Sequence, residues 1–479
     1  MMKYDVVIIG SGLGGLVCGS LLAREGKHVL VLERQAQPGG CMQSYQRDGL
    51  SFDTGFHYVG GLSEGQPLHR VFSYLGLMQL PWVRLDADGF DRVTIGHQTF
   101  PLAEGYDHFA DTLGEYFLKE KKALHQYVEL MRHLPPMEES GSVNAYDWLN
   151  SLFRDPLLIN VLSGSAIKME LCRDSLPLFT FAHGMSSYIA SSWRLRGGGH
   201  LIVNTLVNDI NRLGGKVVCR ADVNKLVEKE GRIVAARCSK GNVYEGDVFI
   251  SDVHPQISFR WLEESKLIKN IFRRRINAME NSFGMFTVSL VLKPGVLPYF
   301  NHNKYVYKKP NVWTFYKDAG GISGVMVSCR VPEEGDYARQ IDLMTPVSWK
   351  LFESWADTTV GRRGEIYEML KIHLADECMR LAERVVPGLR GMVVKYYTST
   401  PLTYRDYTLT PCGSAYGVRK DCRNLPMTTL SPRTPIPNLL LTGQNLMLHG
   451  VEGVTMTALQ TCGDLLGKDY VRTIINCKL

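Results

Sequence analysis

The sequence predicts an α/β protein in which a doubly wound sheet, assembled from discontinuous segments of the chain, is accompanied by a second domain of the α+β class. Three observations support this prediction. A strand, a glycine-rich turn, a helix and another strand follow one another over residues 3–34. The pattern changes to helical periodicity between about residues 64 and 190. Glycine-rich turns and short apolar runs then return after residue 197 and again near residue 439.

The first domain is expected to gather the strand-rich segments of the chain, residues 1–75, 195–255 and 395–479. Its helices are predicted where apolar residues recur at helical spacing, over residues 13–24, 201–213 and 453–466. Its strands are predicted at the short apolar runs, residues 4–9, 29–32, 217–218, 223–227, 233–236 and 439–441. Such an alternation of strands and helices is typical of a parallel sheet covered by helices.

The second domain is expected to comprise residues 76–194 and 256–394. Its first part shows helical periodicity, which is clearest over residues 113–134. Its second part contains apolar runs at 285–291 and 325–330, which are predicted to form antiparallel strands, followed by a long helix at 365–385.

The composition excludes several classes of protein. With 45% hydrophobic and 21% charged residues among 479, the chain is neither disordered nor a coiled coil. Lys and Arg exceed Asp and Glu by 54 − 48 = 6 without a long run of like charge, so no nucleic-acid partner is expected. No apolar run approaches the ~20 residues that cross a bilayer. The first strand begins too early to leave room for a signal peptide.

The cysteines bear on the compartment and on metal binding. There are 11 of them, an odd number, and no two form a C-x-x-C pair. This pattern fits neither a disulfide framework nor a zinc site. We therefore expect reduced thiols, no metal and a cytoplasmic location.

A glycine motif carries the clearest functional signal. Residues Gly10-Ser11-Gly12-Leu13-Gly14-Gly15 follow the first strand directly, and Glu33 ends the second strand. In the Rossmann-like motif G-x-G-x-x-G, the glycines allow a tight turn, a close approach of the backbone to a pyrophosphate and close packing of helix on strand. The helix N-terminus then faces the phosphates, and the acidic residue accepts hydrogen bonds from the ribose. The motif predicts a dinucleotide site but does not by itself choose between NAD and FAD.

The segments that follow resemble a known family. The residues ERQAQPGGCMQSYQRDGLSFDTGFHYVGGL at 33–62, RLRGGGHLIVNTL at 194–206 and LLLTGQNLMLHGVEGVTMTALQT at 439–461 are similar to the retinol saturase and carotenoid isomerase branch of the phytoene desaturase-like flavoproteins. The resemblance spans nearly the whole chain and implies a noncovalently bound FAD. The residues that it implies for binding FAD are Gly10, Ser11, Gly12, Leu13, Gly14, Gly15, Glu33, Arg34, Gly40, Cys41, Met42, Val223, Gly443, Gly453, Val454 and Thr455.

The resemblance also suggests where catalysis takes place. It places His57 and Tyr58 close to the flavin ring, where either could donate or accept a proton. A helix that begins at Gly453 would point its positive end at the flavin, with His449 lining the site and Glu452 capping the helix. Cys41 has no partner thiol or adjacent base, so we give it no catalytic role.

Four tyrosines precede the last predicted strand and could form the wall of an apolar cavity or simply fill the core: Tyr396, Tyr397, Tyr404 and Tyr407.

The resemblance implies an enzyme that reduces, isomerises or desaturates carbon–carbon double bonds of an apolar polyene or isoprenoid, with retinol saturase-like reduction favoured. Two alternatives stay open: a flavin amine oxidase, and a noncatalytic flavin-binding or lipid-binding protein. A second glycine motif followed by helix and acid does not occur in the sequence. The electron donor or acceptor is therefore not identified, and NAD(P)H is a hypothesis for an external reductant.

Residues 267–280 form a basic, amphipathic segment. It predicts a surface helix, and for an enzyme that acts on an apolar substrate it also suggests a peripheral contact with a membrane.

Overall fold

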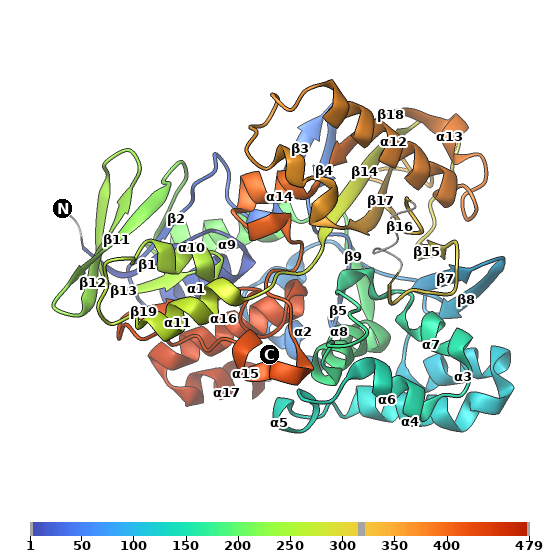
Figure 1. The fold of residues 1–479 in the computed structure, drawn as a ribbon, viewed down its shortest axis with the longest axis horizontal. Helices are drawn as coiled ribbons and strands as arrows, with labels where there is room; N and C mark the ends of the chain where they lie inside the picture. The colour runs from blue at the N-terminus through green and yellow to red at the C-terminus, as the bar shows by residue number, and fades with distance from the viewer. Residues whose placement is uncertain (1–2, 315–320, 477–479) are drawn as a thin grey trace.

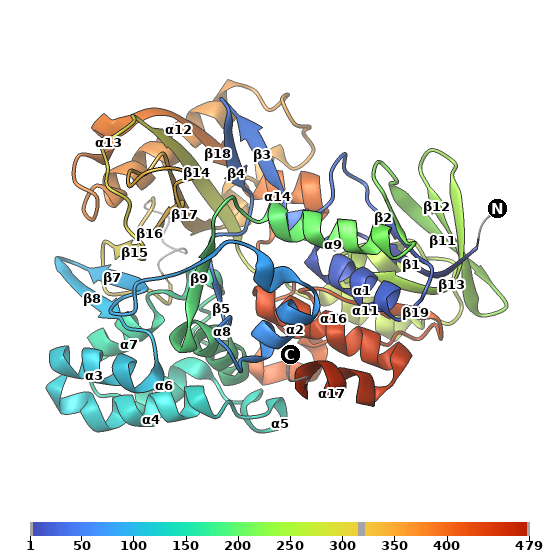
Figure 2. The same ribbon diagram turned by 180° about the vertical axis from the view of Figure 1, so that it is seen from behind.

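The computed structural model describes residues 3–314 and 321–476. Two seven-stranded sheets dominate the fold. Figures 1 and 2 show them side by side, with the N-terminal strands in one half of the molecule and strands β14 to β18 in the other. Each sheet is sandwiched between layers that cover both of its faces, as expected for an α/β domain next to an α+β domain.

The first sheet has the strand order β10-β2-β1-β13-β12-β11, with β19 paired to β13. Its strands are β1 (Tyr4–Ile9), β2 (Val29–Leu32), β10 (Lys216–Val218), β11 (Val223–Lys229), β12 (Arg232–Cys238), β13 (Val243–Ser251) and β19 (Leu439–Leu441). The sequence predicted all of them except β13. This strand is central: its first residues pair antiparallel with β12, and its later residues pair in parallel with β1 and β19.

Both faces of the first sheet carry apolar side chains, as expected for parallel strands that other elements cover on both sides. Val6 and Ile8 face one cluster of core side chains, and Val7 and Ile9 face another. The first cluster is completed by three helices, α1 (Leu13–Arg24), α9 (His200–Arg212) and α16 (Gly450–Leu466). The second is completed by β11 and β12 together with α10 (Pro255–Arg260) and α11 (Asn270–Ala278).

The second sheet has the order β18-β14-β17-β16-β15-β7-β8. Its strands are β7 (Asp91–Ile95), β8 (Gln98–Leu102), β14 (Gly284–Leu292), β15 (Asn303–Tyr307), β16 (Gly324–Cys329), β17 (Gln340–Val347) and β18 (Val393–Ser399). Strands β7 and β8 form a hairpin inside the stretch in which the sequence shows helical periodicity, and the sequence did not predict them. The hairpin is held at the sheet by the parallel pairing of β7 with β15, a contact between distant segments that local periodicity does not reveal.

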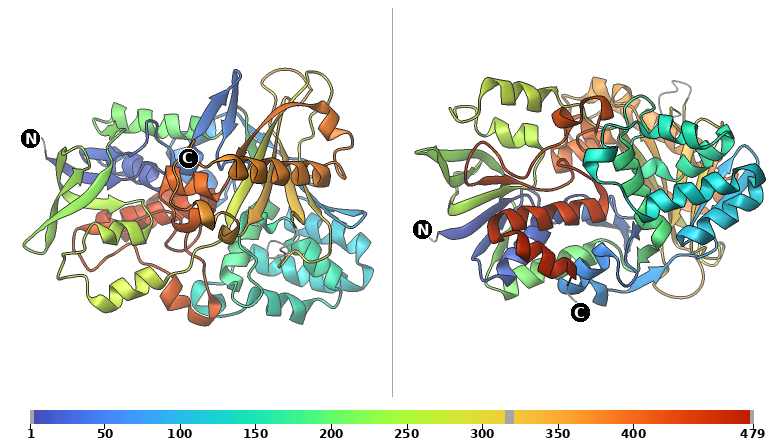
Figure 3. Two further views of the ribbon diagram at one scale, coloured as in Figure 1. Left: turned by 45° about the horizontal axis from the view of Figure 1, so that its top comes forward. Right: turned by 90° about the horizontal axis from the view of Figure 1, so that it is seen from below.

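Helices cover both faces of the second sheet as well. One face packs against the helical segment, whose helices are α3 (Tyr106–Tyr116), α4 (Lys121–Arg132), α5 (Met137–Ser140), α6 (Ala145–Leu152), α7 (Pro156–Ser163) and α8 (Leu178–Ala190). The other face packs against α12 (Glu365–Ala382), the predicted long helix. Figure 3 shows α12 and the helical segment on opposite sides of this sheet.

Further short elements complete the fold. They are η1 (Gly40–Met42), β3 (Ser44–Arg47), β4 (Leu50–Asp53), β5 (Val59–Gly60), α2 (Pro67–Tyr74), β6 (Trp82–Arg84), β9 (Ser192–Leu195), α13 (Leu389–Met392), α14 (Pro401–Thr408), α15 (Leu425–Thr428) and α17 (Lys468–Asn476). Strand β18 lies mostly within the predicted segment 395–479 but pairs with β14 of the second sheet. The division into two domains with the predicted boundaries therefore stays a proposal.

The amphipathic segment 267–280 contains α11. Ile268, Ile276 and Met279 are buried against the first sheet, whereas Ile271 is exposed. Most of its apolar face is thus used within the molecule. Of the helices in the described part of the chain, none is both long and apolar enough to cross a membrane.

Candidate active site

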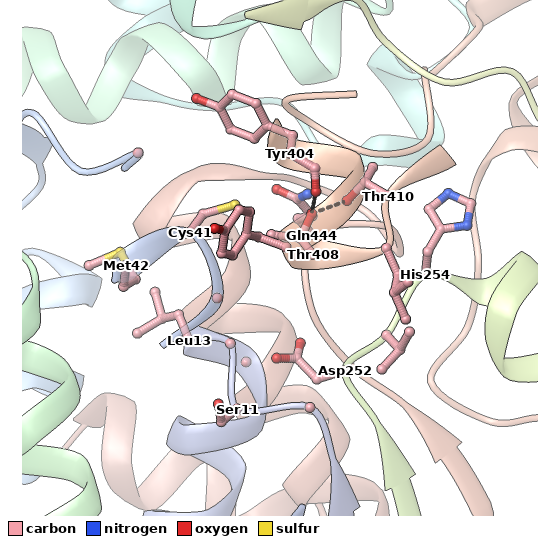
Figure 4. A pocket seen from close by; sticks show the side chains of 18 of the residues that line it. Ser11, Leu13, Cys41, Met42, Asp252, His254, Tyr404, Thr408, Thr410 and Gln444 are labelled. Atoms are coloured by element: carbon pink, nitrogen blue, oxygen red, sulfur yellow. Dashed lines mark hydrogen bonds between the residues drawn. The ribbon is translucent and has the colours of Figure 1, made fainter. Parts of the chain in front are cut away.

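A long cleft begins at the carboxyl ends of β1, β2 and β13 and reaches the second sheet. At one end it is lined by Glu33 and Val223. At the other end it is lined by Met285 of β14 and Met344 of β17. Ligands of doubly wound sheets bind at the carboxyl ends of the strands. Figure 4 shows the cleft from close by, with the glycine turn at Ser11 and Leu13 on one side and Tyr404 further along.

The glycine turn lets two segments approach each other across the cleft. Gly10 has a φ of +97°, a conformation that favours glycine. A Cβ atom at Gly40 would lie 3.1 Å from the Cα of Gly12. The backbones of the turn at residues 10–15 and of the turn at Gly40 therefore form a narrow cradle, and side chains at these glycines would fill it.

Glu33 lies at the end of the cleft beside β11. Its Oε2 accepts hydrogen bonds from the backbone N–H and the hydroxyl of Ser11, and its Oε1 accepts one from the N–H of Gln35 at 2.7 Å. These bonds hold the carboxylate next to the glycine turn. It is in place to accept hydrogen bonds from a ribose.

The residues present fit FAD. The cradle and the N-terminus of α1 suit a pyrophosphate, and Glu33 suits the ribose of an adenosine. The cleft then continues past Gly40 and Cys41 to apolar and aromatic side chains of the second sheet, which leaves room for a second, larger ring system. These residues would hold the adenosine diphosphate half in the first domain and the flavin at the second sheet.

Most of the sequence-predicted cofactor residues line this cleft: Gly10, Ser11, Gly12, Leu13, Gly14, Glu33, Arg34, Gly40, Cys41, Met42, Val223 and Val454. Gly15, Gly443, Gly453 and Thr455 lie behind its wall. A Cβ at Gly15 would lie 2.2 Å from the carbonyl oxygen of Gly10, so this glycine serves the packing of α1 on β1. A Cβ at Gly453 would lie 2.6 Å from Leu448, which gives that residue a similar packing role.

Helix α16 begins at Gly450, three residues earlier than predicted. Gly450 and Val451 therefore line the cleft at the helix N-terminus. The prediction that Glu452 caps the helix was wrong. The N-cap residue is His449, whose side chain does not cap the helix, and Glu452 lies inside the first turn, where its carboxyl group contacts Ser187 of α8. Burial raises the pKa of Glu452 to about 7.

Sequence reasoning missed the residues that follow β13. Asp252, Val253 and His254 line the cleft, as do Gln444 and Asn445 after β19. The apolar run that ends β13 was the available signal, since residues at the carboxyl end of a parallel strand lie at the ligand edge of the sheet.

The far end of the cleft is walled by Met285, Met344, Tyr404 and Tyr416. The hydroxyl of Tyr404 donates to the backbone oxygen of Thr54 at 3.2 Å, and that of Tyr416 donates to the backbone oxygen of Ile167 at 3.0 Å. Burial raises the pKa of both phenols well above the ordinary value. They are neutral hydrogen-bonding groups in a mostly apolar wall.

His57 lines the cleft at this end. Its Nδ1 lies 3.7 Å from Oδ2 of the buried Asp342. Burial lowers the pKa of His57 to about 4, although Asp53 opposes this shift. The imidazole is therefore neutral near pH 7.

Tyr58 points away from the cleft. Its hydroxyl donates to Asp91 at 2.9 Å and lies 2.8 Å from the hydroxyl of Tyr305. Nζ of Lys168 lies 3.2 Å away on the same network. The hydroxyl is thus engaged inside the second domain.

His449 lies behind Tyr416, on which it stacks with ring centroids 4.5 Å apart. Its Nε2 is 2.9 Å from the backbone oxygen of Lys168, to which it donates. Burial lowers the pKa of His449 to about 4. The histidine supports the wall and does not itself line the cleft.

A second limb of the cavity leads outward from the same place. Gly40, Cys41 and Tyr404 line both limbs, and the second continues past Tyr397 to Ile372 of α12. Burial raises the pKa of Cys41 to about 11, so its thiol is protonated and unreactive.

The family model of the NAD(P)-binding Rossmann-like domain matches residues 8–75. All-trans-retinol 13,14-reductase of Rattus norvegicus is 26% identical over an alignment that covers 98% of this chain and 86% of that protein. A protein of Danio rerio named inactive all-trans-retinol 13,14-reductase is 24% identical, with 94% and 84% covered. Prolycopene isomerase 1 of an Oncidium hybrid cultivar is 25% identical, with 87% and 75% covered.

Solved structures share the fold at lower sequence identity. A crystal structure of an oxidoreductase from Methanosarcina mazei has a TM-score of 0.68 and 17% identity, with 97% of this chain and 100% of that chain covered. Putrescine oxidase bound to putrescine has a TM-score of 0.66 and 15% identity, with 98% and 100% covered. The whole chain, and not only its nucleotide-binding part, therefore adopts a fold found in oxidoreductases.

Proposed function

Since this chain belongs to the retinol saturase and carotenoid isomerase branch of the phytoene desaturase-like flavoproteins, we propose that it reduces a carbon–carbon double bond of an apolar polyene or isoprenoid. The chain is a FAD-dependent oxidoreductase. Reduction is favoured over isomerisation because the relatives named all-trans-retinol 13,14-reductase match 96% to 99% of the chain, against 87% for the isomerases. Desaturation of the same class of substrate is the reverse chemistry at the same site.

The observation that carries the proposal is the apolar wall at the second sheet. Met285, Met344 and Tyr416 meet the cleft where the flavin would end, and they carry no charge. Such a wall removes an apolar chain from water and holds it against the ring. An ionic substrate would find no buried countercharge among these side chains.

When bound, FAD supplies the hydride transfer. The chain's own residues then have to position the double bond, exclude water and let one proton reach the other carbon. Since His57 is neutral, it orients the substrate or relays a proton through its ring nitrogens. It is not protonated beforehand and so does not act as the initial proton donor. The hydroxyl of Tyr404 is the other protic group on this wall.

The electron donor is a further part of the proposal. A nicotinamide cofactor such as NAD(P)H would reduce the flavin from outside, because the sequence holds a single glycine motif of the dinucleotide type. Flavin reduction by NADH and by NADPH can be compared directly under anaerobic conditions.

The test uses the purified flavoprotein. Its flavin is photoreduced without oxygen, and all-trans-retinol is then added while the flavin absorbance is followed. Reoxidation of the flavin, with a product heavier by two hydrogens, is the expected result. Oxidised flavin that becomes reduced on adding the polyene identifies a dehydrogenase, and a product of unchanged mass identifies an isomerase. A flavin that responds to none of a panel of retinoids and carotenes overturns the proposal and favours a noncatalytic binding protein.

A peripheral contact with a membrane is a further part of the proposal. Ile366, Met369 and Ile372 lie one turn apart on the outer face of α12 and are 74%, 67% and 57% exposed. Met369 and Ile372 line a groove at the mouth of the outer limb. A lipid surface at this mouth would let an apolar substrate enter without crossing water.

A cytoplasmic location also stays a proposal. All the cysteines in the described part of the chain are free, which suits a reducing compartment; Cys477 lies outside the described residues.

A further inference from the structure

Asp252 lies against the glycine turn, beside the cradle in which the pyrophosphate would lie. Its backbone N–H donates to the oxygen of Ile9 at 2.9 Å, so β1 fixes its position at the end of β13. A Cβ atom at Gly12, Gly14 or Gly443 would lie 2.5, 2.6 or 2.3 Å from its carboxyl oxygens. The carboxyl group therefore fills the space that three glycines leave open. Figure 4 shows it pointing toward the glycine turn.

The carboxyl group also uses the hydrogen-bond donors of that turn. It accepts hydrogen bonds from the backbone N–H groups of Gly15 and Gly12 at the start of α1. This end of a helix attracts one negative charge, from a carboxylate or from a phosphate. A pyrophosphate and an ionised Asp252 would have to share it at close range, and like charges in a partly desolvated site repel strongly.

The other groups that face Asp252 do not relieve this repulsion. Glu33 at the end of β2 adds a charge of the same sign. Cys41 of η1 faces it as a neutral thiol. His254, on its own segment, turns to Asn281 at 2.8 Å and is neutral near pH 7, since burial lowers its pKa to about 4. In the described part of the chain Asp252 forms no ion pair.

We propose that Asp252 is a further residue of the FAD site and that its carboxyl group takes up a proton from solvent when the pyrophosphate binds. The neutral acid keeps its place beside the glycine turn and can donate a hydrogen bond to a phosphate oxygen. The group is ready for this change in the free protein, because burial raises the pKa of Asp252 to about 7. Binding of a dianion raises that pKa further, and linkage then makes the affinity for FAD depend on pH.

The first experiment measures the dissociation constant of FAD by diluting the flavoprotein and following the fluorescence of released flavin. Buffers of constant ionic strength cover about pH 6 to about pH 9, a range that brackets the carboxyl group. For the native protein we expect a constant value below about pH 7 and a rise approaching tenfold per pH unit above it. In Asp252→Asn the slope should disappear, and this variant should bind FAD at least about tenfold more tightly than the native protein at the alkaline end.

A matched control tests whether the loss of the pH dependence is specific to Asp252. Asp91 is another fully buried carboxyl group whose pKa is raised by burial, but it lies in the second domain away from the cleft. Asp91→Asn should keep the slope of the native protein. A slope that persists in Asp252→Asn overturns the inference.

A second measurement needs no variant. FAD is titrated calorimetrically into flavin-depleted native protein near pH 8 in two buffers of different ionisation enthalpy. Uptake of close to one proton per FAD is the expected result, and no proton uptake with a pH-independent affinity overturns the inference. Neither experiment uses a substrate, so the proposed reaction and this inference can fail independently of each other.

Discussion

Nδ1 of His57 lies 3.7 Å from Oδ2 of Asp342, and this contact joins the loop after β4 to strand β17 of the second sheet. Asp342 also accepts a hydrogen bond from the hydroxyl of Ser289 at 2.6 Å. Burial raises the pKa of Asp342 and lowers that of His57. Burial of both groups therefore favours a neutral imidazole at the end of the cleft.

Replacing His57 should slow the reaction without releasing the flavin. We expect His57→Ala to keep its FAD and to reoxidise reduced flavin with a polyene about fivefold more slowly, because an orienting hydrogen bond is worth roughly 1 kcal/mol. The rate of the native protein should show no inflection near pH 6.5, since the pKa of His57 is lowered to about 4. His57→Gln, which keeps an N–H donor, should recover part of the rate. Unchanged rates in both variants would remove His57 from the site.

The glycine turn can be tested through flavin retention. In Gly12→Val the new side chain would collide with Asp252, since its Cβ would lie 2.5 Å from Oδ2, and it would fill the cradle. In Gly15→Val the Cβ would lie 2.2 Å from the oxygen of Gly10 and would force α1 away from β1. Both proteins should be purified without flavin. Gly391→Ala, where a Cβ meets nothing within 4 Å, is the control that should remain yellow. Full flavin content in Gly12→Val would contradict the assignment of the cradle.

Local sequence patterns predicted the elements that are stabilised by nearby residues. Strand β1, helix α1 and strand β2 are recognisable because the apolar periodicity and the glycine turn lie within one short stretch. Strand β13 changes partners along its length, from an antiparallel hairpin to the parallel core, so only its last residues form an apolar run. The β7–β8 hairpin depends on β15, some two hundred residues away, and nothing local marks it.

The same reasoning explains which site residues were found. The cofactor residues on the glycine turn follow from a contiguous motif whose spacing encodes its geometry. Asp252 could not be found in this way, because β13 carries it to the glycine turn from elsewhere in the chain. Tyr58 is next to His57 in sequence, but its side chain packs into the core of the second sheet, and adjacency in the sequence does not reveal this difference.

Tyr58 should contribute to stability and not to turnover. Tyr58→Phe removes a hydroxyl that donates to the fully buried Asp91 at 2.9 Å. Leaving that carboxyl group short of a donor should lower the free energy of unfolding by about 1 to 3 kcal/mol. Denaturant unfolding measures this loss, and flavin content and rate should stay native. Tyr337→Phe, at an exposed position, is the control. A large loss of rate in stable Tyr58→Phe would instead restore the catalytic role suggested by the sequence.

His449 should make the fold sensitive to acid. Its pKa is lowered from 6.5 to about 4 by burial, so the unfolded chain binds a proton that the folded protein does not. Stability is therefore intact above about pH 6.5 and is lost as the pH falls toward about 4. His449→Gln keeps an N–H donor for the oxygen of Lys168 and removes the titration. Between about pH 7 and about pH 5, the variant should lose about 2 kcal/mol less unfolding free energy than the native protein. Equal losses would contradict the burial of a neutral ring.

The membrane contact can be assigned to one of two surfaces. Ile366 and Ile372 lie on the exposed face of α12, with Ile372 at the mouth of the outer limb, whereas Ile271 lies on α11, the segment that the sequence favoured. Ile366 and Ile271 are both 74% exposed, so an acidic side chain should be tolerated equally well at either position. Burying an isoleucine in the interface is worth about 1.5 to 3 kcal/mol. We therefore expect the double variant Ile366→Glu/Ile372→Glu to bind phospholipid vesicles at least about tenfold more weakly in a sedimentation assay, and Ile271→Glu to bind like the native protein. The opposite pattern would assign the contact to α11. A native protein that does not bind vesicles would exclude a membrane contact at either surface.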